Sequence, residues 1–156
     1  MQIGKSHTLI VRNGSNTSAK RHGQQIIVTL RDASTLNDPD VARIVRDAVI
    51  TALRIEAKSY LPKRLAFLAS SNDFHYDRVR FSHASGRWGS CSSNGTISLN
   101  IALMKLPFEL IDYVLIHELS HTIHMNHSQA FWDLVSQANP NYQLHRRNLR
   151  KETPSI

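Results

Sequence analysis

Residues 117–121 read His-Glu-Leu-Ser-His, a spacing that is typical of a metal site that activates water. On an α-helix, His117 and His121 are about 40° apart around the axis and about 6 Å apart along it, so both imidazoles can reach one metal ion. Glu118 would then stand beside a metal-bound water, where a general base is needed. The preceding residues Ile111–Ile116 are largely apolar and indicate a buried helix. Because burial of these ionisable groups is costly without a partner, the pattern predicts a metal site.

A catalytic zinc site needs a third protein ligand and one open position, and the sequence offers His124 and His127. Along a straight helix His124 lies about 10.5 Å from His117, which is too far for both to bind one ion. His127 can bind only if the chain turns back after the helix. Met125-Asn126 would allow this turn, because asparagine tolerates the left-handed conformation that ends helices. We therefore favour His127 as the third ligand and expect His124 to pack nearby.

The chain around the motif contains signals for the elements that would position it. Pro107 and Glu109 mark the start of the motif helix, since an acidic side chain in the first turn suits the helix dipole. Ser128 is a suitable N-cap for a further helix, whose Phe131 and Trp132 we expect to be core residues under the motif helix. The other predicted elements are a strand over Asp77–His83, a loop over Gly86–Gly95, a strand over Thr96–Asn100 and a last element from Pro140 to about Arg150.

The N-terminal segment is predicted to form a hairpin. His7–Val11 and Gln25–Leu30 are short and rich in β-branched residues, and residues 13–16 and 22–23 carry turn signals. We expect these two strands to pair across a long loop.

A helix that backs the sheet is predicted next. Asp38-Pro39 favours a helix start, and apolar residues recur at helical spacing through about Ala57. Leu61-Pro62 is predicted to end this element, because proline disrupts a helix interior.

Four blocks within about residues 78–150 occur in a characteristic order and spacing: Arg87-Trp88-Gly89-Ser90-Cys91-Ser92, Ile97-Ser98-Leu99-Asn100, residues 113–121, and Asn126-His127-Ser128 with Phe131-Trp132. Together they resemble a known family, the YgjP-like metal-dependent hydrolases, which are relatives of the SprT-like and minimal zinc metallopeptidases. The resemblance implies zinc ligands at His117, His121 and His127, a catalytic glutamate at Glu118, and an α+β fold with a small antiparallel or mixed sheet packed on the zinc helix.

Length and composition predict one domain. The chain has 156 residues, 41% of them apolar, which is enough for one core. We expect residues 1–75 to supply the hairpin and the backing helix, and residues 76–150 the core around the metal. The sequence contains no apolar run long enough for a membrane helix and no signal-peptide pattern, and its lone Cys91 cannot form an internal disulfide. These features favour a cytoplasmic protein without membrane contact.

A net charge of +7 favours anionic partners, although a solvated basic surface without a specific partner is an equal alternative. No aromatic residues interleave the basic ones in sequence, as stacking on nucleic acid would require. Arg87 begins the loop that the resemblance places near the metal. It either binds a carboxylate, phosphate or oxyanion there, or it has a structural role in which it packs on Trp88 or pairs with a core carboxylate. Gly89 is expected to serve a turn, and Cys91 to be a small buried side chain.

We therefore predict a hydrolase with one zinc ion per chain, although nitrogen ligands can also bind manganese, cobalt or nickel. Glu118 acts as general base, Arg87 assists the oxyanion, and peptide bonds are the first-choice substrate. Nucleoside triphosphate pyrophosphohydrolysis is the alternative, suggested by the basic charge and by assignments within the resembling family. A zinc-stabilised, non-catalytic nucleic-acid-binding module is the third candidate. Glu118 argues against this module, because a structural zinc site needs no base.

Overall fold

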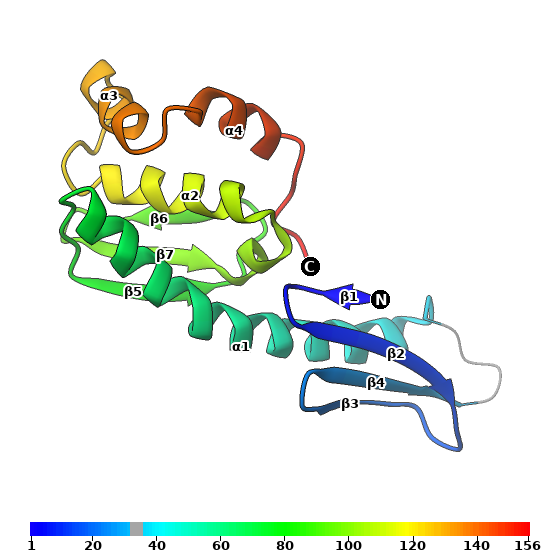
Figure 1. Ribbon diagram of the computed structural model, residues 1–156. Helices are drawn as coiled ribbons and strands as arrows, with labels where there is room; N and C mark the ends of the chain where they lie inside the picture. Colours follow the sequence, from blue (N-terminus) through cyan, green and yellow to red (C-terminus); the bar gives the residue numbers. More distant parts are fainter. Residues whose placement is uncertain (32–35) are drawn as a thin grey trace.

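The computed structural model describes residues 1–31 and 36–156, and these residues form two small sheets and four α-helices (Figure 1). The predicted α+β fold is confirmed. In the N-terminal sheet the strand order is β1 (Gln2–Ile3), β2 (His7–Asn13), β4 (Gln25–Leu30) and β3 (Ser18–His22).

The predicted hairpin between β2 and β4 is wrong, because these two strands pair in parallel. The intervening residues form β3, and it is β3 that pairs antiparallel with β4, across a turn where Gly23 has a φ of +61°. Residues 18–22 read Ser-Ala-Lys-Arg-His and contain no large apolar side chain. This composition suits a strand at the edge of the sheet, where β3 lies. An exposed edge strand of this kind gives little hydrophobic pattern for a sequence analysis to detect.

The helix α1 (Pro39–Ser71) begins where predicted but does not end at Leu61-Pro62. It continues through Pro62 to 33 residues, a length of about 50 Å. A proline inside a helix costs about 3 kcal/mol. The buried side chains of Leu61, Leu65 and Leu68 continue the helical spacing across it, and each contributes about 1.5–3 kcal/mol. Tertiary packing therefore outweighs the local preference.

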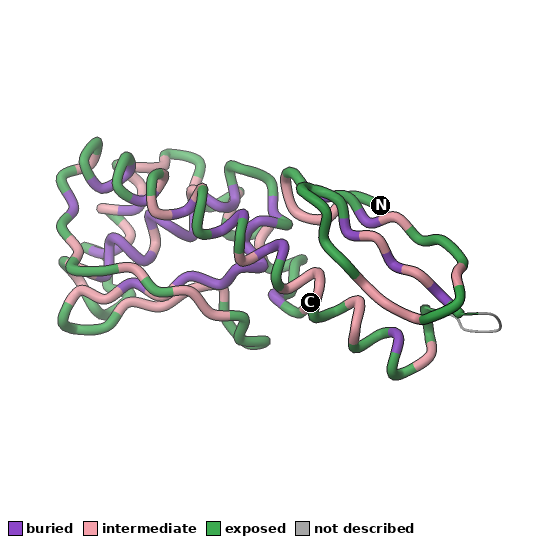
Figure 2. The backbone as a smooth tube through the Cα atoms, turned by 90° about the horizontal axis from the view of Figure 1, so that it is seen from below, coloured by how far each residue is buried: buried purple, intermediate pink, exposed green. Residues whose placement is uncertain are grey.

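Two hydrophobic clusters lie along α1, and Figure 2 shows buried backbone in both halves of the molecule. The first cluster packs the N-terminal sheet on the first part of the helix and includes Leu9, Ile26, Val28 and Val41. The second, larger cluster holds the remaining elements. The one helix thus supports both sheets.

The second sheet has the order β5 (Arg78–Ser82), β7 (Thr96–Asn100), β6 (Gly89–Cys91). Its β5–β7 pair is parallel, and its β6–β7 pair is antiparallel. Both predicted strands are confirmed to within one residue at each end, but the segment predicted as a loop over 86–95 contains β6. A three-residue Gly-Ser-Cys strand has no periodicity of its own, and only its pairing with β7 defines it.

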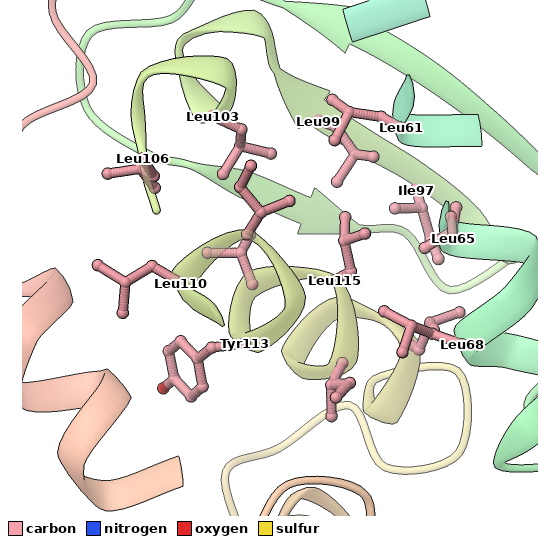
Figure 3. Packing of buried hydrophobic residues seen from close by; sticks show 14 of the residues in the cluster. Leu61, Leu65, Leu68, Ile97, Leu99, Leu103, Leu106, Leu110, Tyr113 and Leu115 are labelled. Carbon is pink, nitrogen blue, oxygen red and sulfur yellow. The ribbon is translucent and has the colours of Figure 1, made fainter. Parts of the chain in front are cut away.

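The larger core lies between this sheet and the helices. A 3-10 helix η1 (Ile101–Lys105) leads into α2 (Phe108–Ser120), and α3 (Gln129–Ala138) and α4 (Tyr142–Leu149) follow. Figure 3 shows side chains of α1, β7 and α2 meeting in this core, among them Leu61, Leu65, Ile97, Leu99 and Leu115. No helix in the described parts of the chain has the length and apolar character of a membrane span.

Glu56 of α1 is a buried carboxylate that ties the N-terminal sheet to the helix. It accepts hydrogen bonds from the backbone N–H groups of Lys5, Ser6 and His7, and the Nδ1 of His7 lies 2.6 Å from its Oε2. Burial raises the pKa of Glu56, but these hydrogen bonds outweigh it and hold the pKa below the ordinary value of 4.5.

We predict that Glu56→Gln destabilises the fold by about 2–3 kcal/mol, the magnitude of a lost charged hydrogen bond. A carboxylate whose folded pKa is lowered stabilises the protein above its unfolded pKa, and this contribution is lost as the pH falls through the folded value. Urea unfolding below pH 4.5 should therefore show a shallower loss of stability in the variant than in the wild type. Asp47→Asn, which removes an exposed carboxylate of α1, is the control. Parallel pH curves for Glu56→Gln and wild type would contradict this account.

Candidate metal centre

The helix α2 holds the motif in place because it is buried on most sides. Leu110, Ile111, Leu115 and Leu119 are fixed in the core, so the remaining face carries the polar motif. The helix ends at Ser120, and the next residue, His121, keeps helical dihedrals (φ −68°, ψ −16°). The geometry of an i, i+4 pair is therefore preserved between His117 and His121.

The chain turns back after His121, as predicted, but the expected left-handed conformation at Asn126 is wrong, because among the described non-glycine residues a positive φ occurs at Asp73. The carbonyl of Ser120 accepts the backbone N–H groups of Ile123 and His124 in a tight turn. Ser128 then caps α3, since its Oγ accepts the N–H of Phe131 at 3.3 Å.

This turn brings His127 over the end of α2. Its Nε2 lies 3.3 Å from the Nε2 of His117, and the possible ligand atoms of His117, His121 and His127 all lie within 4.8 Å of one another. The side chain of His124 is not part of this cluster. Its backbone carbonyl instead lies 3.0 Å from the Nδ1 of His121.

The three histidines fit a metal ion. Because the carbonyl oxygen of His124 can only accept a hydrogen bond, the Nδ1 of His121 carries the ring proton. The Nε2 of His121 therefore keeps a lone pair for a bond to a metal. Burial, reinforced by His121, His127 and Arg146, lowers the pKa of His117 to about 3 and keeps its ring neutral. Two nitrogens bound to one tetrahedral zinc ion at about 2.0–2.1 Å are themselves about 3.3 Å apart. The separation of 3.3 Å between His117 and His127 matches this value, whereas separations in the cluster extend to 4.8 Å.

Aromatic rings fix the orientations of the imidazoles. His121 stacks on Phe131 with ring centroids 4.5 Å apart, and His127 stacks on Trp132 at 5.9 Å. Phe131 is fully buried, as predicted, whereas Trp132 is only half-buried and also stacks on Tyr142 at 5.5 Å. Phe131 and Trp132 were predicted only as core residues, and no role was predicted for Tyr142. Helical spacing alone could not have shown that these rings meet the histidines.

Glu118 is also buried, with 6% of its surface exposed. Burial raises the pKa of Glu118 to about 7, while the positive charge of Arg87 acts in the opposite direction. The carboxylate lines a pocket of about 360 Å³ together with the three histidines, Arg87 and Cys91. The structure thus brings all five predicted site residues to one cavity.

The predicted role of Gly89 in a turn is wrong, because this residue begins the strand β6. A Cβ atom at this position would lie 3.1 Å from the Cγ of Glu118, 3.2 Å from its Oε2 and 3.1 Å from the carbonyl oxygen of Ser98. The missing side chain therefore makes room for the carboxylate. The glycine in the Arg-Trp-Gly-Ser-Cys-Ser block was the only sequence signal for this requirement.

Arg87 is exposed and lines the metal pocket. Its backbone carbonyl accepts a hydrogen bond from the Nδ2 of Asn100, a fully buried side chain that also donates to the carbonyl of Ala84. Asn100 thereby fixes the loop that carries Arg87. Within residues 1–31 and 36–156, the guanidinium–aromatic contacts join Arg64 to Phe67 and Arg146 to Trp132. The structural alternative in which Arg87 packs on Trp88 is therefore not observed.

Cys91 is half-buried and packs against the larger core. The expectation of a small buried side chain is met only in part, because Cys91 also lines the metal pocket. Burial, with a smaller effect of Glu118, raises the pKa of its thiol.

Comparison with known proteins identifies the family of this chain. The family model for the YgjP-like metallopeptidase domain matches residues 1–152 of the chain. The chain belongs to the YgjP-like family. The resemblance inferred from the sequence is confirmed, and this YgjP-like protein is a metal-dependent hydrolase.

One solved structure supports the same conclusion. The fold is similar to the crystal structure of the metallopeptidase zymogen of Pyrococcus abyssi abylysin, with a TM-score of 0.50 and 28% sequence identity. The match covers 56% of this chain and 90% of that chain. No curated protein matches the sequence of this YgjP-like chain.

The geometry predicts which histidines bind metal. His127→Ala should weaken zinc binding by on the order of 100-fold or more, because it removes a ring that faces His117. His124→Ala should have little effect, because it is the backbone carbonyl of His124 that contacts His121. Titration against a chromophoric chelator measures both affinities. A larger loss in His124→Ala would show that the turn holds a different third ligand.

The space around Gly89 provides a second prediction. Gly89→Ala should displace the Glu118 carboxylate and lower kcat by on the order of 10²-fold, the effect of a misplaced catalytic group, while zinc binding is retained. Gly86→Ala is the matched control, since a Cβ there meets nothing within 4 Å. Equal activity in the two alanine variants would show that the carboxylate has room to move.

Proposed function

We propose that this YgjP-like protein is a zinc-dependent peptidase in which His117, His121 and His127 hold the ion and Glu118 is the general base. The observation that carries the proposal is the cluster itself: three imidazoles whose possible ligand atoms lie within 4.8 Å of one another, with the buried carboxylate of Glu118 next to His117 in the sequence. When bound there, zinc would lower the pKa of a water ligand and polarise a substrate carbonyl.

The protein's own groups perform the proton transfers. Glu118 takes a proton from the attacking water, and the carbonyl carbon becomes tetrahedral. Glu118 then gives this proton to the leaving amine. Arg87 lines the same pocket and can donate hydrogen bonds to the developing oxyanion, because a guanidinium is charged at every relevant pH.

Peptide hydrolysis is favoured over nucleoside triphosphate hydrolysis. The family is described as a metallopeptidase domain. Triphosphate chemistry commonly uses Mg²⁺ held by carboxylates, and the three-histidine cluster is the only group of candidate metal ligands within residues 1–31 and 36–156. Nitrogen ligands suit zinc better than magnesium.

The proposal predicts that Glu118→Gln lowers kcat on a cleavable peptide by about 10²–10⁴-fold, because the amide cannot accept the proton. The variant should keep its zinc, measured by metal analysis of the folded protein. A peptide library and a set of nucleoside triphosphates, incubated separately with zinc-loaded wild type, identify the substrate class. Full activity in Glu118→Gln would remove Glu118 from the mechanism, and hydrolysis of triphosphates alone would exclude the peptidase.

Arg87→Ala in the same assay distinguishes two roles of the guanidinium. If it stabilises the oxyanion of a peptide, kcat falls while KM changes little. If it binds a phosphate, KM for the triphosphate rises strongly and added salt weakens binding further.

A further inference from the structure

A groove lies along α1, apart from the metal centre. Two pockets of about 440 and 400 Å³ adjoin there and share Ser59 and Tyr60. We refer to them together as the α1 groove. The residues that matter for its chemistry are Ile55, Tyr60, Lys63 and Phe67 of α1, Phe108 at the start of α2, and Lys5 of the N-terminal segment.

The α1 groove gathers large apolar side chains that the fold leaves in solvent. Ile55 is 40% exposed, Phe67 56% and Phe108 50%. The rings of Tyr60 and Phe108 lie 5.4 Å apart and form one apolar wall. Exposed apolar side chains that gather in a concave surface mark a binding site more often than scattered ones do.

The charged residues of the groove are mainly cationic. Lys5, Arg21, Lys63 and Arg64 line it, against the single carboxylate of Glu56, which is already occupied by its own hydrogen bonds. The charge of Arg64 is neutralised by Asp112, 2.6 Å away. The negative charge of Glu109 partly offsets the positive charge of Lys5. The remaining positive charge is moderate. It complements a ligand with a few carboxylates.

The aromatic rings do not form a stacking surface for nucleic acid. Lys5 lies over the ring of Phe108 at 4.4 Å, and Tyr60 tilts against the same ring at 55°. The guanidinium of Arg64 lies over Phe67 at 4.9 Å. Single-strand binders instead present open ring faces along a strongly positive channel. An extended polypeptide needs only an apolar wall for its side chains and cations for its carboxylates.

We propose that the α1 groove binds an extended acidic polypeptide segment that carries bulky apolar side chains. Phe108 lies nine residues before His117 on α2, about 14 Å along the helix axis. Four or five residues of extended chain can span this distance. The segment would be a remote part of the protein substrate, an assignment that rests on the peptidase function proposed above, whereas the binding itself does not.

Fluorescence anisotropy tests the groove without any hydrolysis. The probe is a fluorescein-labelled peptide that alternates aspartate with leucine or phenylalanine, titrated with full-length, zinc-loaded Glu118→Gln protein. In this background, Lys63→Glu should weaken binding about tenfold or more, the effect of about 1.4 kcal/mol. Phe67→Ala should weaken it about fivefold, and replacing the aspartates of the probe with lysine should abolish it.

Two matched controls separate the groove from general effects. Lys58→Glu reverses an exposed charge on the same helix outside the groove, and Val11→Ala trims an exposed apolar residue on β2. Both should leave the affinity within about twofold of the parent. The proposal is overturned if the peptide does not bind, if Lys58→Glu acts as strongly as Lys63→Glu, or if oligothymidylate of equal charge binds more tightly with the same dependence on Lys63 and Phe67. None of these outcomes bears on whether zinc and Glu118 hydrolyse short peptides.

Discussion

Three imidazole nitrogens held within 4.8 Å of one another, in a partly water-excluded site, impose the constraint on which the rest of this structure depends. Protonated rings at this distance would repel one another. Neutral rings can instead form a hydrogen bond, as the 3.3 Å between the Nε2 atoms of His117 and His127 allows, or direct their lone pairs at one shared cation. The buried helix α2, the turn after His121 and the aromatic side chains of α3 all act to keep the imidazoles in this arrangement.

The long helix α1 provides the fixed support. Its second part packs against α2 in the larger core, and Arg64 makes a two-point contact with Asp112 of α2 at 2.8 and 2.6 Å. Its first part carries the N-terminal sheet, which Glu56 ties down through His7 and its neighbours. One continuous helix therefore packs on both sheets and also contacts α2, the helix that carries His117 and Glu118.

Close approach between the sheet and α2 shapes the pocket that Glu118 lines. The strand β6 comes so near to Glu118 that a Cβ atom at position 89 would lie 3.1–3.2 Å from its side chain, and the buried Asn100 holds the loop that presents Arg87. The resulting cavity is small and has few side chains to select a substrate. A chain of 156 residues gains further contact area only on surfaces outside this cavity, such as the groove along α1.

The sequence by itself determined the elements with strong local signals and the residue types of the site. The motif helix, the strand over Thr96–Asn100, the cap at Ser128 and the choice of His127 over His124 follow from spacing, capping and helix dimensions. These properties depend on residues that are close neighbours in the sequence, so they can be inferred without knowledge of the fold.

Only the tertiary structure decided the features that depend on distant partners. The parallel pairing of β2 with β4, the edge strand β3 and the short strand β6 exist because another strand is present to bond them. The helix passes through Pro62 because burial of leucines on both sides outweighs the local cost. Gly89 beside Glu118 and the aromatic support of the histidines are contacts between segments far apart in sequence. These contacts are stabilised by close packing between distant segments, which cannot be predicted from a local sequence pattern.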